Sequence, residues 1–163
     1  MVRKYAYTDP ARLVPEGGIV KARDVMTAHP SVVTPEDTIR TAAQVMRDRH
    51  VGALPVIDNL TDRQLKGIIT DRDIVIRCLA AGHGADCTVK EHMSSRHLTT
   101  VRLDDEVREV AHKMRRDHVR RIPVLSEDDR VAGVVAVVDI ATRLRPADPA
   151  LVEGIERSGR VTG

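Results

Sequence analysis

An internal repeat limits the folds open to this chain more than any single motif does. The pattern around Met46, His50 and Pro55, VMRDRHVGALPV, returns 68 positions later as KMRRDHVRRIPV. The stretch Gly67-Ile-Ile-Thr-Asp-Arg-Asp73 returns 66 positions later as Gly133-Val-Val-Ala-Val-Val-Asp139. Because small insertions in loops explain the drift in spacing, the repeat predicts a duplicated supersecondary unit with a pseudo-twofold core.

The apolar pattern of each repeat predicts the element order β-α-β-β-α, and hence a mixed α/β (α+β) fold. The expected strands span residues 30–34, 53–57 and 65–69 in the first repeat and 98–101, 121–125 and 131–135 in the second. Thr34, followed by Pro35 and two acids, is predicted to cap the first long helix. A helix from Asp71 would close the first repeat, with Ile74, Ile76 and Leu79 available to a core.

At 163 residues, the chain fits one compact module in which two small repeats share a core. We divide it into an arm (1–21), a first repeat (22–82), a linker (83–87), a second repeat (88–145) and a tail (146–163). The arm lacks clear periodicity, and prolines interrupt helix formation in the tail, where a short helix is expected around residues 151–157.

The composition argues against several classes of function. Lys and Arg (26) nearly balance Asp and Glu (24), which disfavours nucleic acid as the main partner. The aromatic residues are Tyr5 and Tyr7, so the repeats offer no aromatic platform on which bases could stack. No apolar run is long enough to cross a bilayer, and the polar N-terminus lacks the apolar region of a signal peptide. We therefore expect a cytoplasmic protein without a membrane partner, in which Cys78 and Cys87 are thiols.

Thr70 and Asp73 stand where a strand is predicted to give way to a helix. Three residues apart, they fit a capping box, in which the hydroxyl and the carboxylate satisfy backbone N–H groups. They also fit a ligand site, because helix N-termini attract anions and a hydroxyl beside a carboxylate can hold sugar hydroxyls. The return of the glycine and the terminal acid in the second repeat favours the ligand site.

The ordered landmarks h-P-V and G-h-h-T-x-x-D, in tandem, resemble the cystathionine-β-synthase (CBS) domain pair, also called a Bateman module. The resemblance covers residues 22–145. It implies two clefts related by the pseudo-twofold axis, each able to hold an adenosine-bearing ligand such as AMP, ATP, NAD or S-adenosylmethionine. It further implies a regulatory module for signal transduction, a disc-like homodimer and an effector protein of unknown identity, with no catalytic cofactor.

The resemblance also implies roles for individual residues. By position, Asp73 and Asp139 correspond to the acids that bind the ribose hydroxyls, and Thr70 is the motif hydroxyl with Arg72 beside it. The second motif carries Ala136 where the family has Thr or Ser, which removes a hydrogen bond worth on the order of 1 kcal/mol. The pocket of Thr70 and Asp73 is therefore expected to be the better of the two.

Arg120 and Arg121 take the places of Gly52 and Ala53 of the first repeat, and the resemblance makes them candidates for phosphate binding. They could instead form an exposed cationic strand end or an interface pair. The residues expected to wall the adenine are aliphatic: Val33, Ala53, Pro55, Val101, Ile122 and Pro123.

Other chemistry finds less support in the sequence. His83, Cys87, His92 and His97 surround the linker, but H-x-x-x-C does not match a regular zinc framework and the chain has two cysteines, so no metal ligand is assigned. No P-loop, G-x-S-x-G, G-x-G-x-x-G or H-E-x-x-H motif points to an enzyme. The alternative to a nucleotide sensor is a non-catalytic, stress-related interaction scaffold with vestigial pockets, which Ala136 keeps open.

Overall fold

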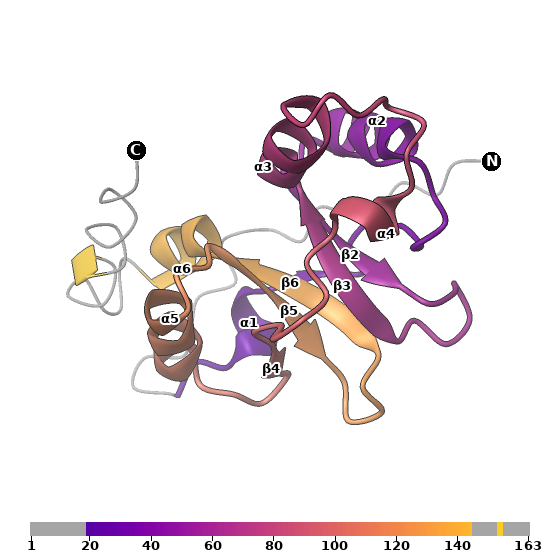
Figure 1. Ribbon diagram of the computed structural model, residues 1–163. Coiled ribbons are helices and arrows are strands. Elements are labelled where there is room, and N and C mark those ends of the chain that lie inside the picture. The colour runs from indigo at the N-terminus through magenta and orange to yellow at the C-terminus, as the bar shows by residue number, and fades with distance from the viewer. Residues whose placement is uncertain (1–18, 145–152, 155–163) are drawn as a thin grey trace.

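The protein consists of two α+β halves that lie side by side (Figure 1). The computed structural model describes residues 19–144 and 153–154. The elements of the first half of the chain are α1 (Ala22–Val25), β1 (Thr27–Ala28), α2 (Ile39–Arg49), β2 (Ala53–Ile57), β3 (Leu65–Thr70), α3 (Asp71–Asp73) and η1 (Ile74–Leu79). Those of the second are α4 (Val89–His92), β4 (Val101–Arg102), α5 (Val107–Arg116), β5 (Arg121–Leu125), β6 (Val131–Ala136) and α6 (Val137–Leu144). Most of the predicted arm and tail lies outside the described residues, as does the helix expected near 151–157 apart from the helical Glu153 and Gly154.

The strand pairing repeats with the spacing of the sequence. β2 pairs antiparallel with β3, and β5 pairs antiparallel with β6. Leu54 lies opposite Ile69 in the first pair, and their counterparts Ile122 and Val135 lie opposite each other in the second. A parallel pairing repeats in the same way, as an isolated bridge between residues 33 and 56 and as part of β4–β5 at residues 101 and 124. These registers confirm the predicted tandem repeat and its pseudo-twofold symmetry.

The first segment of each repeat, residues 22–28 in one and 88–94 in the other, crosses to the other half of the molecule and is called the exchanged segment. Thr27 in β1 pairs with Val134 in β6, which completes a four-stranded sheet in the order β1-β6-β5-β4. At the equivalent position, Ser94 pairs with Ile68 in β3. The short helices follow, so that α1 packs against α5 and α6 while α4 packs against η1. This exchange was not predicted from the sequence, and it joins the two halves.

A glycine in each half accommodates a methionine of the crossing segment. A Cβ atom on Gly67 would lie 2.8 Å from the Met93 sulfur and 2.7 Å from the Ser94 carbonyl oxygen. A Cβ atom on Gly133 would overlap the side chain of Met26. The repeated glycine and methionine therefore form one structural device, which seats the exchanged segment against the sheet.

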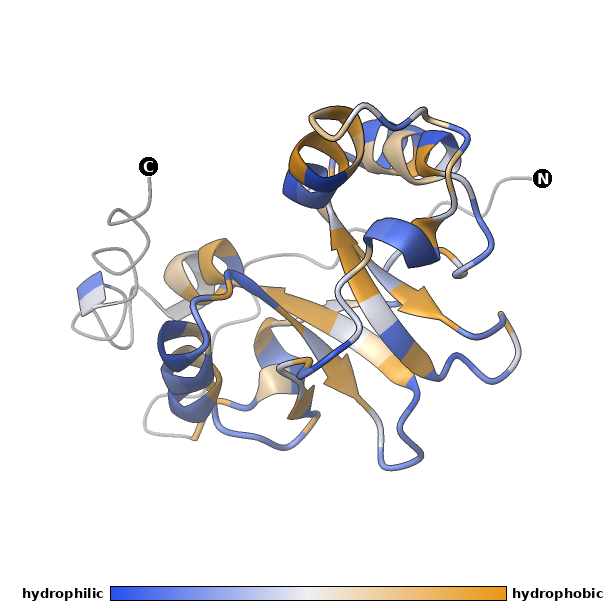
Figure 2. Cartoon of the chain, viewed as in Figure 1, coloured by the Kyte–Doolittle hydropathy of each residue, from blue (hydrophilic) through white to orange (hydrophobic). Residues whose placement is uncertain are grey.

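Apolar side chains gather along the strands and on the inner helix faces, whereas the loops and most of α5 are polar (Figure 2). Each half has its own core, and each core contains a residue of the exchanged segment: Val25 in one and Val89 in the other. A third cluster at the junction contains Ile57, Leu125 and Val131. None of the helices in the described part of the chain is both long and apolar enough to cross a membrane.

The first long helix starts later than predicted, at Ile39, with Thr38 as its cap. Thr38 accepts a hydrogen bond from the Thr41 N–H at 3.1 Å, whereas Thr34 donates to the Asp37 carboxylate in a separate turn. Thr38 also pairs with Thr88 of the exchanged segment, and its own backbone is extended, so the helix begins after it. The long-range pairing therefore overrides the local helix signal.

The helix after the first motif does not keep the α-helical period. Beyond Ile74 it is a π-helix, in which the Ala80 N–H bonds the Val75 carbonyl at 2.9 Å. Because the longer turn rotates successive side chains differently, Ile76 and Leu79 are 56% and 54% exposed and do not enter the core as predicted.

Left-handed backbone recurs at equivalent places in the two halves. The residues concerned are His29 and His97, His50 and His118, and Arg63 and Asp129. His50 ends α2 in this conformation, and its N–H bonds the carbonyls of Met46 and Arg47. The paired histidines at residues 50 and 118 thus serve the backbone at the end of a helix.

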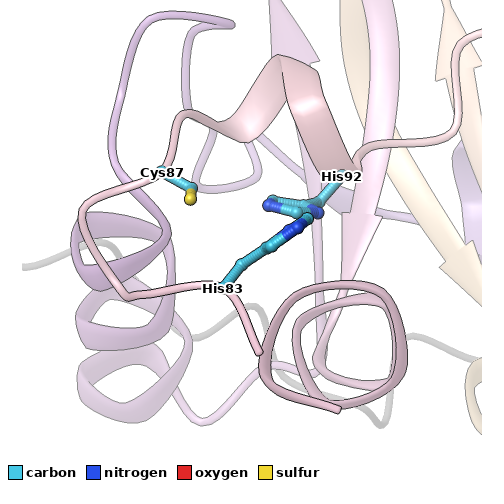
Figure 3. Close-up of side chains that lie close together, drawn as sticks. All are labelled: His83, Cys87 and His92. Atoms are coloured by element: carbon cyan, nitrogen blue, oxygen red, sulfur yellow. The ribbon is translucent and has the colours of Figure 1, made fainter. Parts of the chain in front are cut away.

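The linker after η1 folds back over α4. Gly82 adopts a left-handed φ of 79°, which turns the chain out of the helix. As Figure 3 shows, the side chains of His83, Cys87 and His92 then point into one space between the linker, η1 and α4.

Candidate functional site

A cleft of about 1520 Å³ lies between the two halves. Three segments line it: β3 to η1 (residues 68–77), residues 94–100 at and beyond the end of the exchanged segment, and α5 to β5 (113–123). The sequence-predicted site residues that line it are Thr70, Arg72, Asp73, Arg120, Arg121 and Pro123. The fold thus brings the first motif together with both arginines of the second repeat.

Thr70 and Asp73 form a closed capping box at the start of α3. The Asp73 Oδ2 atom accepts from the Thr70 N–H at 2.9 Å and from the Thr70 hydroxyl at 2.7 Å. In return, the Asp73 N–H donates to the Thr70 Oγ1 atom at 3.1 Å. The capping interpretation is therefore correct for the structure, and any ligand must bind to a carboxylate that already has partners.

The second oxygen of Asp73 faces Arg77, one turn later. The Arg77 Nε atom lies 3.3 Å from Asp73 Oδ1, and the two side chains are 51% and 13% exposed. Arg77 also donates to the Ser94 hydroxyl at 3.1 Å, across to the exchanged segment. Because Arg77 is half exposed, its ion pair can exchange with ligand hydroxyls at small cost.

The cleft is strongly basic. Seven of its lining side chains are Lys or Arg, and three are Asp. Within the described residues, four of the seven take part in no ion pair: Arg72, Arg96, Arg120 and Arg121. A concave wall with this excess of cations raises the local concentration of anions, phosphates above all.

Arg121 reaches across the cleft to the first half. Its Nη2 atom would lie 3.1 Å from a Cβ atom placed on Gly52, beside the Asp71 carboxylate. The missing side chain at Gly52 thus leaves room for the guanidinium close to the first motif. Arg120 is also exposed. Its backbone carbonyl accepts a hydrogen bond from the Val137 N–H at 3.0 Å, and its side chain takes no part in that bond.

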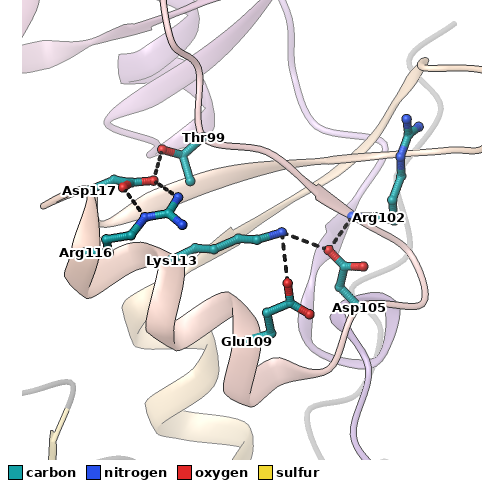
Figure 4. A network of polar contacts seen from close by, with 7 residues as sticks. All are labelled: Thr99, Arg102, Asp105, Glu109, Lys113, Arg116 and Asp117. Atoms are coloured by element: carbon teal, nitrogen blue, oxygen red, sulfur yellow. Dashed lines mark hydrogen bonds and ion pairs between the residues drawn. The ribbon is translucent and has the colours of Figure 1, made fainter.

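A network on α5 fixes the opposite rim of the cleft (Figure 4). Asp117 accepts from the Arg116 Nε atom at 2.7 Å and from the Thr99 hydroxyl at 2.7 Å. These hydrogen bonds, first from Arg116 and then from Thr99, hold the pKa of Asp117 far below its usual range. Lys113 is held in the same way between two carboxylates, at 3.3 Å from Asp105 and 3.4 Å from Glu109. This rim is preorganised by its own ion pairs.

The other sequence-predicted site residues lie elsewhere. Those expected to wall the adenine, other than Pro123, are buried in the strands and cores: Val33, Ala53, Pro55, Val101 and Ile122. Asp139 lies at the second motif, where its Oδ2 atom accepts from the Ala136 N–H at 2.9 Å. This matches the bond between Asp73 and Thr70 N–H, without the hydroxyl that Ala136 lacks.

Sequence reasoning missed the contribution of residues 94–100. They line the cleft because the exchange of segments carries them to the first motif. The available signal was the repeated methionine, Met26 and Met93, which marks the start of each exchanged segment. The repeat alone does not state which half such a segment joins.

The comparisons with known proteins agree with this architecture. A sequence model of the CBS domain matches residues 22–79 and 89–146. Hypoxic response protein 1 of Mycobacterium tuberculosis is 38% identical over 123 residues, which cover 76% of this chain and 84% of that protein.

The fold resembles those of many solved structures. A crystal structure of Hypoxic Response Protein I with two coordinated zinc ions aligns with a TM-score of 0.67 at 39% identity, covering 75% of this chain and 97% of that one. The CBS domain pair of protein MJ0100, in complex with 5-methylthioadenosine and S-adenosyl-L-methionine, aligns with a TM-score of 0.66 at 30% identity. That alignment covers 76% of this chain and 94% of the other.

Proposed function

Because this chain belongs to the CBS-domain family, we propose that it senses an adenosine-bearing nucleotide bound in the cleft of Thr70 and Asp73. Over the matched residues it is a CBS pair, a regulatory module and not an enzyme. The nucleotide is AMP, ATP, NAD or a related adenosyl compound, and it is released unchanged.

One observation carries the proposal: the cleft places the Thr70–Asp73 motif opposite an excess of unpaired cations. A ribose has neighbouring hydroxyls that a carboxylate can accept, and a phosphate chain needs cations within reach of the ribose. Both requirements meet in this cleft. The MJ0100 pair, which is similar to this chain, supports the choice of an adenosyl ligand because its complex contains two such compounds.

We assign the parts of the ligand as follows. The ribose hydroxyls bind Asp73 and displace Arg77 from its Oδ1 atom. The phosphates bind Arg120 and Arg121, with Arg72 and Arg96 nearby. The adenine lies against aliphatic lining, to which Pro123 belongs as predicted and to which Ile68 and Leu98 add apolar surface.

Binding would shift the population between two arrangements of the two halves. A ligand that contacts both halves stabilises the arrangement of the halves that binds it more tightly. The shift in population is set by the difference between its affinities for the two arrangements. The output surface is proposed to be a homodimer interface formed by η1 and α6, where Leu79 and Val138 are exposed apolar residues. Val75 and Ile76 of η1 are also exposed and line the cleft, so they connect it with this surface. A cytoplasmic location fits the two free thiols, and the effector protein is of unknown identity.

A second candidate function is an interaction scaffold with vestigial pockets. It is favoured by Asp73, because both of its carboxylate oxygens already have partners within the chain. It is also favoured by Ala136, which lacks the hydroxyl of the motif. The stress role named in Hypoxic response protein 1 belongs with this alternative. The two functions differ in whether any nucleotide binds at physiological concentration.

Isothermal titration calorimetry of ligand-stripped protein against AMP, ATP, NAD, S-adenosylmethionine and adenosine separates them. The sensor predicts saturable binding with one dominant pocket, tighter for the phosphorylated ligands than for adenosine. It also predicts that Asp73→Ala weakens binding more than Asp139→Ala, since the first motif keeps its hydroxyl. No binding by folded protein to any of the five would favour the scaffold.

A further inference from the structure

We propose that His83, Cys87 and His92 form a binding site for a divalent transition-metal ion, with zinc as the expected occupant. One ligand atom from each residue lies within 4.8 Å of the others. Figure 3 shows the two imidazoles and the thiol converging from the linker and from α4. This cluster lies apart from the nucleotide cleft, which none of the three residues lines.

The distances are close to those of a coordinated ion. Zinc binds histidine nitrogen at about 2.0–2.1 Å and thiolate sulfur at about 2.3 Å, so tetrahedral ligands lie about 3.3–3.7 Å apart. Since the ligand atoms are within 4.8 Å of one another, they must approach by at most about 1.5 Å. His83 is exposed and can move this far without disturbing a core.

His92 supplies an independent observation. The residue is only 3% exposed, yet its Nε2 atom has no hydrogen-bond partner among the residues that the structure describes. A buried polar atom without a partner costs about 1–3 kcal/mol and requires an explanation. The ring faces His83 with 5.2 Å between centroids, so it already points into the cluster. A metal ion there would give a buried imidazole its missing partner.

The loop that carries the ligands is held in place by the rest of the fold. The Cys87 N–H bonds the Gly84 carbonyl at 3.2 Å, which closes the turn between the first two ligands. The Cys87 carbonyl accepts from the Ile39 N–H at 2.9 Å, at the start of α2. Because these hydrogen bonds hold the backbone that carries the ligands, binding needs little rearrangement beyond side-chain rotation.

The donor set selects the class of metal. Two imidazoles and one thiolate suit zinc and its neighbours, whereas calcium and magnesium prefer oxygen ligands. Cys78 is nearby but has another role: it is fully buried in the core and its thiol donates to the Gly84 carbonyl at 3.5 Å. The fourth position of a tetrahedral site is therefore left to water or to a small ligand.

The spacing of the ligands along the chain gives the ion a structural effect. His83 follows η1, Cys87 lies at the end of the linker and His92 ends α4. An ion would thus fasten the exchanged segment of the second repeat to the last helix of the first. We expect it to stabilise the exchange of segments by binding the folded state alone.

Cobalt titration of tag-free, reduced, metal-stripped protein tests the site, because cobalt(II) reports its ligands by absorption. We expect one equivalent to bind, with a thiolate-to-cobalt charge-transfer band and the intense visible bands of tetrahedral cobalt, and zinc to displace it. Cys87→Ser should abolish the charge-transfer band. His83→Ala should weaken zinc binding by more than the about 10- to 100-fold that loss of an outer-shell partner causes.

Matched variants control for folding and for adventitious binding. Cys78→Ala removes the other thiol and His112→Ala removes an exposed histidine of α5, and both should keep the band and the wild-type affinity. His83 and Cys87 are not fully buried, so their variants are expected to fold, which circular dichroism checks. The proposal is overturned by the absence of a thiolate band in wild-type protein, or by a band that survives Cys87→Ser.

Discussion

The guanidinium of Arg77 forms an ion pair with the carboxylate of Asp73, with 3.3 Å between Nε and Oδ1. The same guanidinium donates through Nη1 to the carbonyl of His92, also at 3.3 Å. One side chain thus joins the acid that we assign to the ribose with a histidine that we assign to a metal ion. The two proposed sites share a physical link through η1.

This link predicts that metal and nucleotide affect each other. An ion that fixes His92 also orders its carbonyl, which together with Ser94 is the partner that Arg77 keeps when the ribose displaces it from Asp73, so less order remains to be gained when a nucleotide binds. We expect zinc to tighten AMP binding by about fivefold, the low end of typical allosteric coupling. Calorimetric titrations of AMP into zinc-loaded and metal-free protein measure the effect. An equal gain in Cys87→Ser, or no gain in wild-type protein, would contradict it.

Arg120 and Arg121 should matter for the phosphates and not for the nucleoside. Each is exposed in the cleft, and a hydrogen bond to a charged group contributes about 1.5–3 kcal/mol, so Ala at either position should weaken ATP binding about tenfold or more. Adenosine binding should change little. Arg49→Ala, an exposed arginine of α2 outside the cleft lining, is the matched control. If the two nucleotide-site variants weaken adenosine as much as ATP, the phosphate assignment is wrong.

The two glycines opposite the methionines should differ in how they can be rescued. Gly67→Ala and Gly133→Ala should each lower the free energy of unfolding by about 1–3 kcal/mol, since each added Cβ atom meets occupied space. At Gly133 the nearest atoms all belong to the Met26 side chain, so Met26→Ala should recover part of the loss. At Gly67 the Ser94 backbone carbonyl remains 2.7 Å away, so Met93→Ala should recover less. Urea unfolding of the two double-mutant cycles measures this, and strict additivity at Gly133 would refute it.

The lowered pKa of Asp117 predicts part of the loss of unfolding free energy at low pH. Its pKa is lowered in the folded protein by hydrogen bonds from Arg116 and Thr99, while an unfolded Asp titrates near about 3.9. Its stabilising effect is therefore complete above that pH and is lost as the pH falls through the lower folded pKa. Between about pH 4.5 and 2.5, wild-type protein should lose more unfolding free energy than Asp117→Asn. Urea titrations across this range test it, with Glu127→Gln in the β5–β6 turn as the control that should follow wild type.

The repeat predicted the architecture because duplicated spacing carries over directly into duplicated strand registers. It did not predict the exchange of the segments around Thr27 and Ser94, since a short segment contains no local signal for the half that it joins. The same long-range pairing moved the helix start from Thr34 to Thr38. Local chemistry was thus read correctly where partners are near in sequence, and less well where they are distant.

The candidate site shows the same division. The capping box of Thr70 and Asp73 follows from their spacing, and the structure contains it. The cluster of His83, Cys87 and His92 does not match a regular zinc framework by spacing, and it becomes visible once the linker folds back over α4. The proposed function depends on whether Asp73, besides capping the helix, binds the ribose.

A pair of equivalent turns allows the most direct test of that role. Asp37 accepts from the Thr34 N–H and hydroxyl at 2.7 and 3.0 Å, as Asp73 does from Thr70, but it does not line the cleft. Asp73→Asn and Asp37→Asn therefore make the same chemical change inside and outside the site. Calorimetric titration of ATP into both folded variants should show binding weakened about tenfold or more in Asp73→Asn and unchanged in Asp37→Asn. Wild-type affinity in Asp73→Asn, or an equal loss in both, would contradict a ribose-binding role for Asp73.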